Sequence, residues 1–107
     1  MIKEQMNKNG YKYKLLVSSD RIHNKQVCIY EQIDQHQNHK VVAHEVQVLR
    51  YAIATKHTKK YEEGTEYIIY PSNNDWGKYG WTYIDNLNEA TAKYNDTVTK
   101  LSFKGRL

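Results

Sequence analysis

The chain carries few side chains that could perform covalent or acid–base chemistry. Cys28 is the only cysteine, and it lies in an apolar run where a buried, unreactive thiol is expected. A catalytic thiolate needs a neighbouring base, and His44, on the strand expected beside it, is the candidate. Because the sequence has neither a nucleophile elbow nor a phosphate-binding glycine loop, we expect no enzyme activity.

Histidines in a polar segment raise the possibility of a metal site. His36 and His39 lie three residues apart, with His44 further along the chain. Imidazole and the Cys28 thiolate are ligands of zinc and of late transition metals. However, no second thiol and no matching carboxylate pair completes the set, and the flanking glutamines and asparagines are typical of a solvated loop. We expect no metal and no cofactor.

Interleaved cations and aromatic rings are the pattern that best suggests a function. Single-stranded nucleic acid is bound by charges on its phosphates and rings against its bases. The candidate binding residues are Arg50, Lys56, Lys59, Lys60, Trp76, Lys78, Tyr79 and Trp81. The alternative is that the rings form the core and the lysines the solvent face of the same strands. The regular alternation around Tyr11 and Tyr13 favours this alternative there, whereas both interpretations stand for the two tryptophans.

Composition indicates one small folded domain. The 107 residues include 16 basic and 12 acidic side chains, for a net charge of +4 and a pI near 9.1, a mild bias compatible with an anionic partner. Leu, Ile, Val and Phe make up only about a fifth of the chain, but ten tyrosines and two tryptophans add apolar area to a thin core.

The cellular location follows from what the sequence lacks. A single cysteine cannot form an internal disulfide and suits a reducing compartment. The polar N-terminus has no apolar core of a signal peptide, and no apolar run is long enough to span a bilayer. We expect a cytoplasmic protein, in a bacterium or in its host cell, with no membrane contact.

The first half of the chain shows the period of strands. Residues 1–10 are polar and are expected to be frayed, whereas residues 11–17 and 27–33 alternate apolar and polar side chains. Residues 34–39 form a polar loop of hairpin length. Residues 41–53 fit both periods, and we expect a long strand, with or without a bulge, leaving a helix as the alternative.

The second half combines short strands with a helix. Residues 65–70 and 79–84 are expected to be strands. Asn86, with a glutamate three residues on, is typical of a helix start, and we expect this helix to end at residues 95–97. Residues 98–103 then follow as a candidate last strand.

These elements predict an α+β fold. We expect an antiparallel meander of four to five strands with one C-terminal helix packed on it. Residues 1–107 form a single domain, frayed at residues 1–10 and 104–107.

A turn-rich aromatic block carries one resemblance. Residues 70–83 read Tyr-Pro-Ser-Asn-Asn-Asp-Trp-Gly-Lys-Tyr-Gly-Trp-Thr-Tyr. The block looks like one in small uncharacterised proteins of Bacteroidetes and their mobile elements, and residues 30–32 and 44–47 fit the same pattern. This resemblance implies an accessory protein encoded by a phage or mobile element. The small size of the protein and the provenance that the resemblance implies suggest an inhibitor of host defence, such as an anti-CRISPR protein.

A second resemblance covers the same block. Trp76-Gly77-Lys78, with Gly80 and the helix that follows, is similar to the WGR domain, which sets such a strand and helix on an antiparallel sheet and contacts nucleic acid. By this match Trp76, Gly77 and Gly80 would hold a structural corner. Lys78 stands where the family has arginine, and it lacks the planar fork that suits phosphate.

Together these patterns favour a non-enzymatic binding protein. Its expected partner is nucleic acid, RNA or DNA, or a nucleoprotein complex. The alternative is a protein–protein interaction module or a homodimer with no nucleic-acid contact. In that case exposed Trp and Tyr side chains would be contact hot spots, and an uncovered edge strand would extend a partner's sheet.

Overall fold

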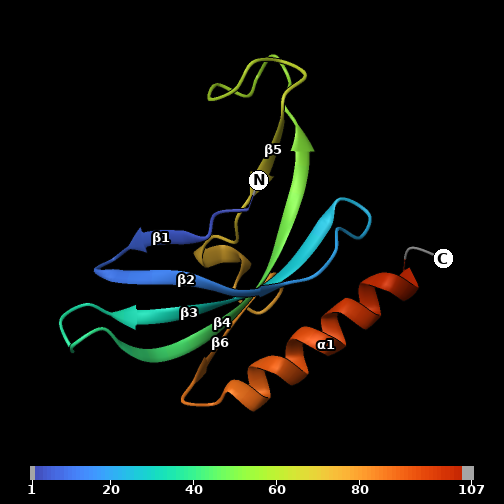
Figure 1. Cartoon of the computed structure of the whole chain (residues 1–107). Helices are drawn as coiled ribbons and strands as arrows, with labels where there is room; N and C mark the ends of the chain where they lie inside the picture. Colours follow the sequence, from blue (N-terminus) through green and yellow to red (C-terminus); the bar gives the residue numbers. More distant parts are fainter. Residues whose placement is uncertain (1, 105–107) are drawn as a thin grey trace.

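The computed structural model describes residues 2–104. Within them a six-stranded antiparallel sheet carries one long helix on one face (Figure 1). The expected α+β fold, an antiparallel sheet with one C-terminal helix, is confirmed, with six strands where four to five were expected and with the last strand outside the expected meander. The elements are β1 (Gln5–Lys8), β2 (Tyr11–Ser18), β3 (Lys25–Asp34), β4 (Lys40–Ile53), β5 (Glu66–Ile69), the 3₁₀ turn η1 (Asn73–Asp75), β6 (Gly80–Ile84) and α1 (Leu87–Lys104).

Strand β4 organises the sheet. Strands β1 to β5 pair in chain order, and β6 returns to β4. The outer edge of β4 is shared: its first half pairs with β6 and its last four residues pair with β5. Residues 41–53 are therefore strand, not helix, as their Val-rich alternation favours. The register shift opposite Gln32 and Ile33 leaves Val42 as the extra residue of a bulge.

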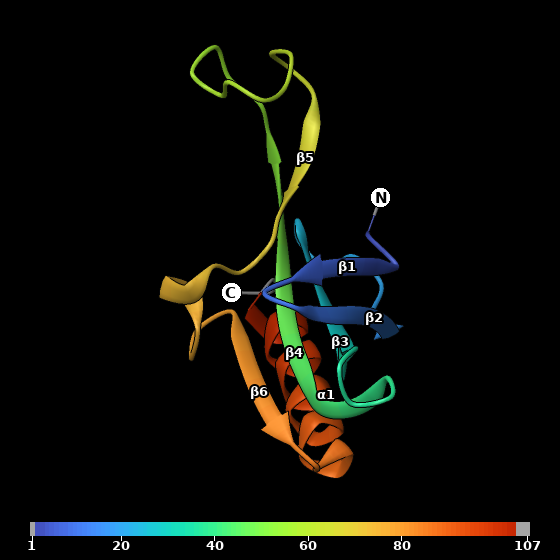
Figure 2. The same cartoon turned by 90° about the vertical axis from the view of Figure 1, so that its left-hand side faces the viewer.

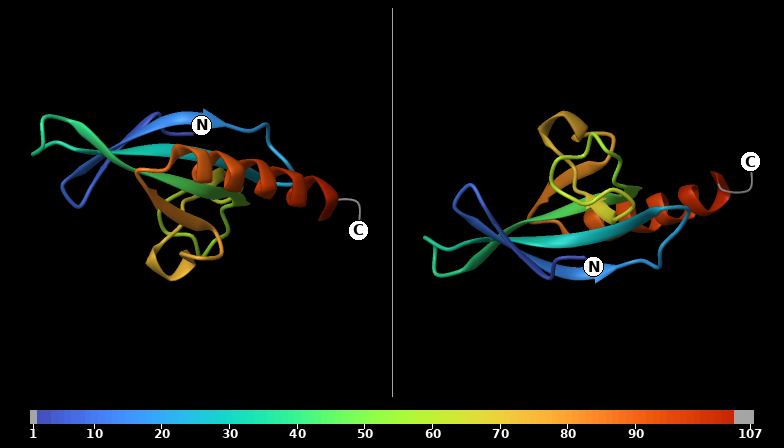
Figure 3. Two further views of the ribbon diagram at one scale, coloured as in Figure 1. Left: turned by 90° about the horizontal axis from the view of Figure 1, so that it is seen from below. Right: turned by 90° about the horizontal axis from the view of Figure 1, so that it is seen from above.

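Strands β5 and β6 run in the same direction, end to end, along that edge. Between them the chain leaves the sheet over residues 70–79, which we call the edge excursion. It contains η1 and stands off from the sheet (Figures 2 and 3). The backbone gap is bridged where the Val48 N–H donates to the Tyr79 carbonyl at 2.8 Å.

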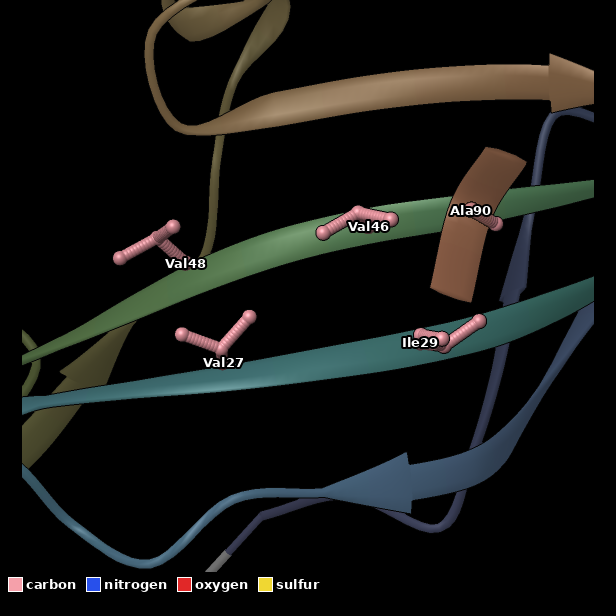
Figure 4. Packing of buried hydrophobic residues seen from close by; sticks show 5 residues of the cluster. All are labelled: Val27, Ile29, Val46, Val48 and Ala90. Carbon is pink, nitrogen blue, oxygen red and sulfur yellow. The ribbon is translucent and has the colours of Figure 1, made fainter. Parts of the chain in front are cut away.

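The core lies mainly under the helix. Val27 pairs with Val48 and Ile29 with Val46, so four aliphatic side chains share one face, and Ala90 of α1 packs on them (Figure 4). The opposite face holds a second cluster of Tyr13, Cys28, Tyr30 and Leu49. This face is covered by β1, β2 and the segment before them rather than by a helix.

Helix α1 is longer than the sequence predicts. Its start is confirmed, since the Glu89 N–H donates to Asn86 Oδ1 at 2.9 Å. The stop expected at residues 95–97 and the strand expected at 98–103 are wrong. The Thr97 hydroxyl donates back to the Lys93 carbonyl, and Lys100 pairs with Asp96 at 2.9 Å. Polar residues that often end helices are here bonded within the helix, while its apolar stripe stays on the sheet.

The N-terminal segment also departs from expectation. Residues 5–8, within the part expected to be frayed, form β1 and pair with β2. Asn9 (φ 54°) and Gly10 (φ 82°) close the hairpin, which is the backbone that a two-residue hairpin turn requires. Of residues 104–107, which were expected to be frayed, Lys104 is the last residue of α1, and residues 105–107 lie outside the described residues. No helix in residues 2–104 is both long and apolar enough to cross a membrane.

Candidate nucleic-acid interface

The residues expected to bind lie in three separate parts of the molecule. Three lysines lie on the loop between β4 and β5, which projects beyond the rest of the sheet (Figures 1 and 2). A second group lies on or beside the edge excursion. Trp81 lies on the helix-covered face. The first group is Lys56, Lys59 and Lys60, and the second is Arg50, Trp76, Lys78 and Tyr79.

Trp81 is a packing residue. It pairs with Val46 on the face covered by α1, where both it and Tyr79 contact the aliphatic core. The Lys93 ammonium lies 4.1 Å from its ring centroid. The interpretation of this ring as core therefore fits the geometry better than an exposed stacking role.

Trp76 lies on the other face of the sheet. Its indole Nε1 donates to Thr82 Oγ1 at 2.9 Å, and Thr82 and Trp81, as neighbours in a strand, point to opposite faces. The ring covers Gly80 so closely that a Cβ there would lie 2.6 Å from ring carbon Cε3. The two tryptophans therefore do not form one stacking surface.

Ion pairing holds the edge excursion in place. Asp75 accepts hydrogen bonds from Ser72 N–H at 2.9 Å and Ser72 Oγ at 3.2 Å, which lower the pKa of its carboxyl group, with help from the Arg50 and Lys78 charges. The Arg50 guanidinium reaches the same carboxylate at 3.2 Å and stacks 4.2 Å from the Tyr79 centroid. Arg50 is thus committed to internal contacts, whereas Lys78 is exposed.

A groove on the β4–β5 hairpin brings one predicted lysine together with several rings. Its volume is about 340 Å³, and we call it the tyrosine groove. Its lining is Lys3, Tyr51, Lys60, Tyr61, Glu66, Tyr67, Ile68 and Tyr70. The Tyr61 and Tyr67 rings are stacked, with centroids 4.9 Å apart and planes 16° from parallel.

Cations flank this groove from two sides. The Lys3 ammonium lies 5.5 Å from the Tyr70 centroid, and the Lys3 N–H donates to the Tyr70 hydroxyl at 3.0 Å. Lys60 lines the groove from the loop. Both lysines are exposed to solvent, so the groove combines rings with charges that a ligand can reach.

The acidic residue of the groove is neutralised by a partner. Both terminal nitrogens of Arg21 donate to the Glu66 carboxylate, at 2.8 and 2.7 Å, and this bidentate contact lowers the pKa of Glu66. The same guanidinium lies 3.9 Å from the Tyr51 ring centroid. Glu66 therefore opposes an anionic ligand less than a free carboxylate would.

Sequence reasoning missed Lys3 and the four tyrosines of the groove. Lys3 lies in the segment expected to be frayed. A usable signal existed for the tyrosines, since Lys60-Tyr61 repeats the cation–ring pair of Arg50-Tyr51. What the sequence does not show is that the hairpin turn brings Tyr61 back onto Tyr67.

The side chains considered for catalysis are not brought together. Cys28 pairs with Gln47 and His44 with Glu31, so the thiol and the imidazole point to opposite faces of the sheet. Burial raises the pKa of the Cys28 thiol to about 12, the opposite of what a nucleophile needs. Among residues 2–104 no cluster of three or more His, Cys, Asp or Glu could hold a metal ion.

Comparison with protein-family models, with curated proteins and with solved structures gave no match to this chain. The two resemblances described from the sequence stay predictions.

Proposed function

We propose that this is a non-enzymatic cytosolic binding protein that holds single-stranded nucleic acid, RNA or DNA, free or within a nucleoprotein complex. The observation that carries the proposal is the tyrosine groove, where stacked rings lie between accessible lysines. Every base has a flat face, so rings of this kind bind strands of any sequence, each stacked base contributing about 1–3 kcal/mol.

The projecting loop extends the charged surface. Lys56 and Lys59 are exposed there, close in sequence to Lys60 of the groove. The loop has a defined shape, because Thr55 N–H donates to Thr58 Oγ1 at 3.1 Å. Lysines act as point charges toward phosphate rather than as bidentate readers. This combination fits binding along a backbone more than recognition of a sequence.

The proposal includes a biological setting drawn from the sequence. A small basic protein of a phage or mobile element that binds nucleic acid in this way would inhibit host defence by occupying the strand, or the nucleoprotein complex, that the defence system uses. Like an anti-CRISPR protein, it would need no catalysis.

One observation favours a second candidate, a protein–protein contact. Strand β2 extends past its four-residue pairing with β1, and there Leu16 is 46% and Val17 38% exposed. An apolar edge segment of this kind suits addition of a partner's strand. Because this region lies outside the tyrosine groove, the two candidates respond to different substitutions.

The test is binding of a fluorescent oligouridylate, followed by anisotropy between about 50 and 200 mM salt. We expect affinity to fall as salt rises, and the double variant Lys60→Gln/Tyr61→Ala to bind at least tenfold more weakly. Losing Lys60 removes about 0.7 from the slope of log affinity against log salt if that lysine meets one phosphate. Lys100→Gln on α1 is the matched control, because it removes an equal charge far from the groove.

Two results would overturn this function. One is that the oligouridylate does not bind at low salt. The other is equal loss in the control and the groove variant, which would show only a non-specific effect of net charge. A variant in which Leu16 and Val17 are replaced by threonine should leave the binding of the oligouridylate unchanged.

A further inference from the structure

Tyr70 of the tyrosine groove also lines a second hollow. Its volume is also about 340 Å³, within the range of small-molecule sites. Strand β4 supplies the floor with Glu45 and Gln47, and Tyr13, Tyr70 and Trp76 line the walls, with Lys8 of β1 among the remaining lining residues. We call it the acceptor pocket.

The floor of this pocket consists of buried hydrogen-bond acceptors. Glu45 is 8% and Gln47 6% exposed, two residues apart on one face of β4. Gln47 Nε2 donates to Glu45 Oε1 at 3.0 Å. Gln47 Oε1 is buried and has no hydrogen-bond partner within the described part of the chain. A buried acceptor in this state is costly unless a donor from outside pairs with it.

Burial and neighbouring charges set the electrostatics of the pocket. Burial raises the pKa of Glu45, and the Lys8 charge opposes that shift. Burial also raises the pKa of Tyr13 to about 12, with the Glu45 charge as a second cause. These groups therefore affect one another across the pocket, and Tyr13 stays a neutral hydroxyl at physiological pH.

The walls select a flat ligand. Trp76 is held by its bond to Thr82 while 38% of its surface stays exposed, so one ring faces solvent at a fixed position. Tyr13 and Tyr70 add two more rings. Lys8 is exposed, and its ammonium would attract a phosphate and repel an incoming organic cation.

These features define the edge that the ligand presents. A floor of acceptors requires neighbouring N–H donors on a planar group. Among the bases, guanine has two such donors side by side, N1–H and the N2 amino group. Adenine and cytosine place an acceptor nitrogen beside their amino group, and uracil places its N–H between two carbonyls. A guanidinium has the right donors, but it carries the charge that Lys8 repels.

We propose that the acceptor pocket binds a guanine base, stacked against Trp76 with its donor edge on Glu45 and Gln47. A free guanine nucleotide is the simplest occupant. A nucleic-acid strand lying in the tyrosine groove would place one of its guanines in this pocket. This second case rests on the proposed function. The pocket would then add a base preference to a groove that has none.

The experiment follows the indole N–H signals of Trp76 and Trp81 by NMR during titration with GMP, AMP, CMP and agmatine, a guanidinium cation. We expect GMP to shift the Trp76 signal saturably and to leave Trp81 in place, with the other ligands at least tenfold weaker. Glu45→Gln should weaken GMP binding tenfold or more. The NMR spectrum of the Glu45→Gln variant shows whether it is folded. Glu89→Gln on α1 is the matched charge control.

Three results would overturn the proposal: AMP binding as tightly as GMP, agmatine binding more tightly than GMP, or no Trp76 shift with GMP up to about 10 mM, ten times a millimolar Kd. An oligouridylate with and without one guanine separates the two proposals. If oligouridylate binds and one guanine does not raise its affinity, the proposal for the acceptor pocket is wrong and the proposal for the tyrosine groove stands. If GMP binds and oligouridylate does not, the proposal for the tyrosine groove is wrong and the proposal for the acceptor pocket stands.

Discussion

At the scale of single residues, close packing decides which positions tolerate change. Gly80 is required by the Trp76 ring rather than by its own backbone, since a Cβ would lie 2.6 Å from that ring. The resemblance to the WGR domain implied a structural corner at this glycine. In the folded chain Gly80 is buried, and it is the first residue of β6.

We expect Gly80→Ala to reduce the free energy of unfolding by about 1–2 kcal/mol, because the new methyl group displaces the ring and breaks its bond to Thr82. Chemical denaturation measures this loss. In the Trp76→Ala background the same change should cost much less, since the obstructing ring is gone. Equal costs in both backgrounds would contradict the packing argument.

Glu45 gives a pH-dependent prediction at the same scale. Its folded-state pKa is raised by burial, so between the unfolded and folded pKa values the folded state binds more protons, and stability falls as pH rises through that interval. Glu45→Gln should therefore be more stable than the parent at pH 7, with the gain disappearing below the unfolded pKa of about 4.3. Lys8 and Tyr13 are the other titratable side chains that face this group across the pocket.

The measurement is thermal unfolding of both proteins at a series of pH values. A stability gain for Glu45→Gln that is the same at every pH would show a packing effect instead of removal of a buried charge.

At the scale of elements, local signals identified most of the structure. Alternation located β2 and β3, the strands expected at residues 65–70 and 79–84 correspond to β5 and β6, and the Asn86 cap located the start of α1. The helix end was missed because residues 95–97 are poor helix formers by propensity, while the spacing of Tyr94, Val98 and Leu101 on the core continues through them. Tertiary packing outweighed propensity there.

Asn86 tests how much the start of α1 depends on its cap. We expect Asn86→Ala to lower the free energy of unfolding by about 1 kcal/mol, because the Glu89 N–H then loses its acceptor. Asn86→Asp should retain the stability, since its carboxylate accepts the same bond and suits the helix dipole. Circular dichroism during denaturation compares the three proteins. A neutral Asn86→Ala would mean that packing alone fixes the helix start.

At the scale of the whole molecule, the candidate sites depend on contacts that no local pattern reveals. The sequence indicated basic residues beside rings and named Lys60 and Trp76, which line the two hollows. It did not indicate that Lys3 would reach Tyr70 from 67 residues away, nor that Trp76 and Trp81 would lie on opposite faces. Such pairings arise from strand register, which a single sequence specifies only in part.

The edge excursion also has a consequence for how this surface can diverge. Because β5 and β6 each pair with β4 on their own, residues 70–79 can change in length or composition without altering the register of either strand. Tyr70 and Trp76, which line the hollows, thus lie on a segment that is held mainly by side-chain contacts, among them the Trp76–Thr82 hydrogen bond and the Arg50–Asp75 ion pair. A protein with this sheet and helix can therefore vary its ligand by changing the excursion, provided that the contacts of Trp76 and Asp75 are kept or replaced together.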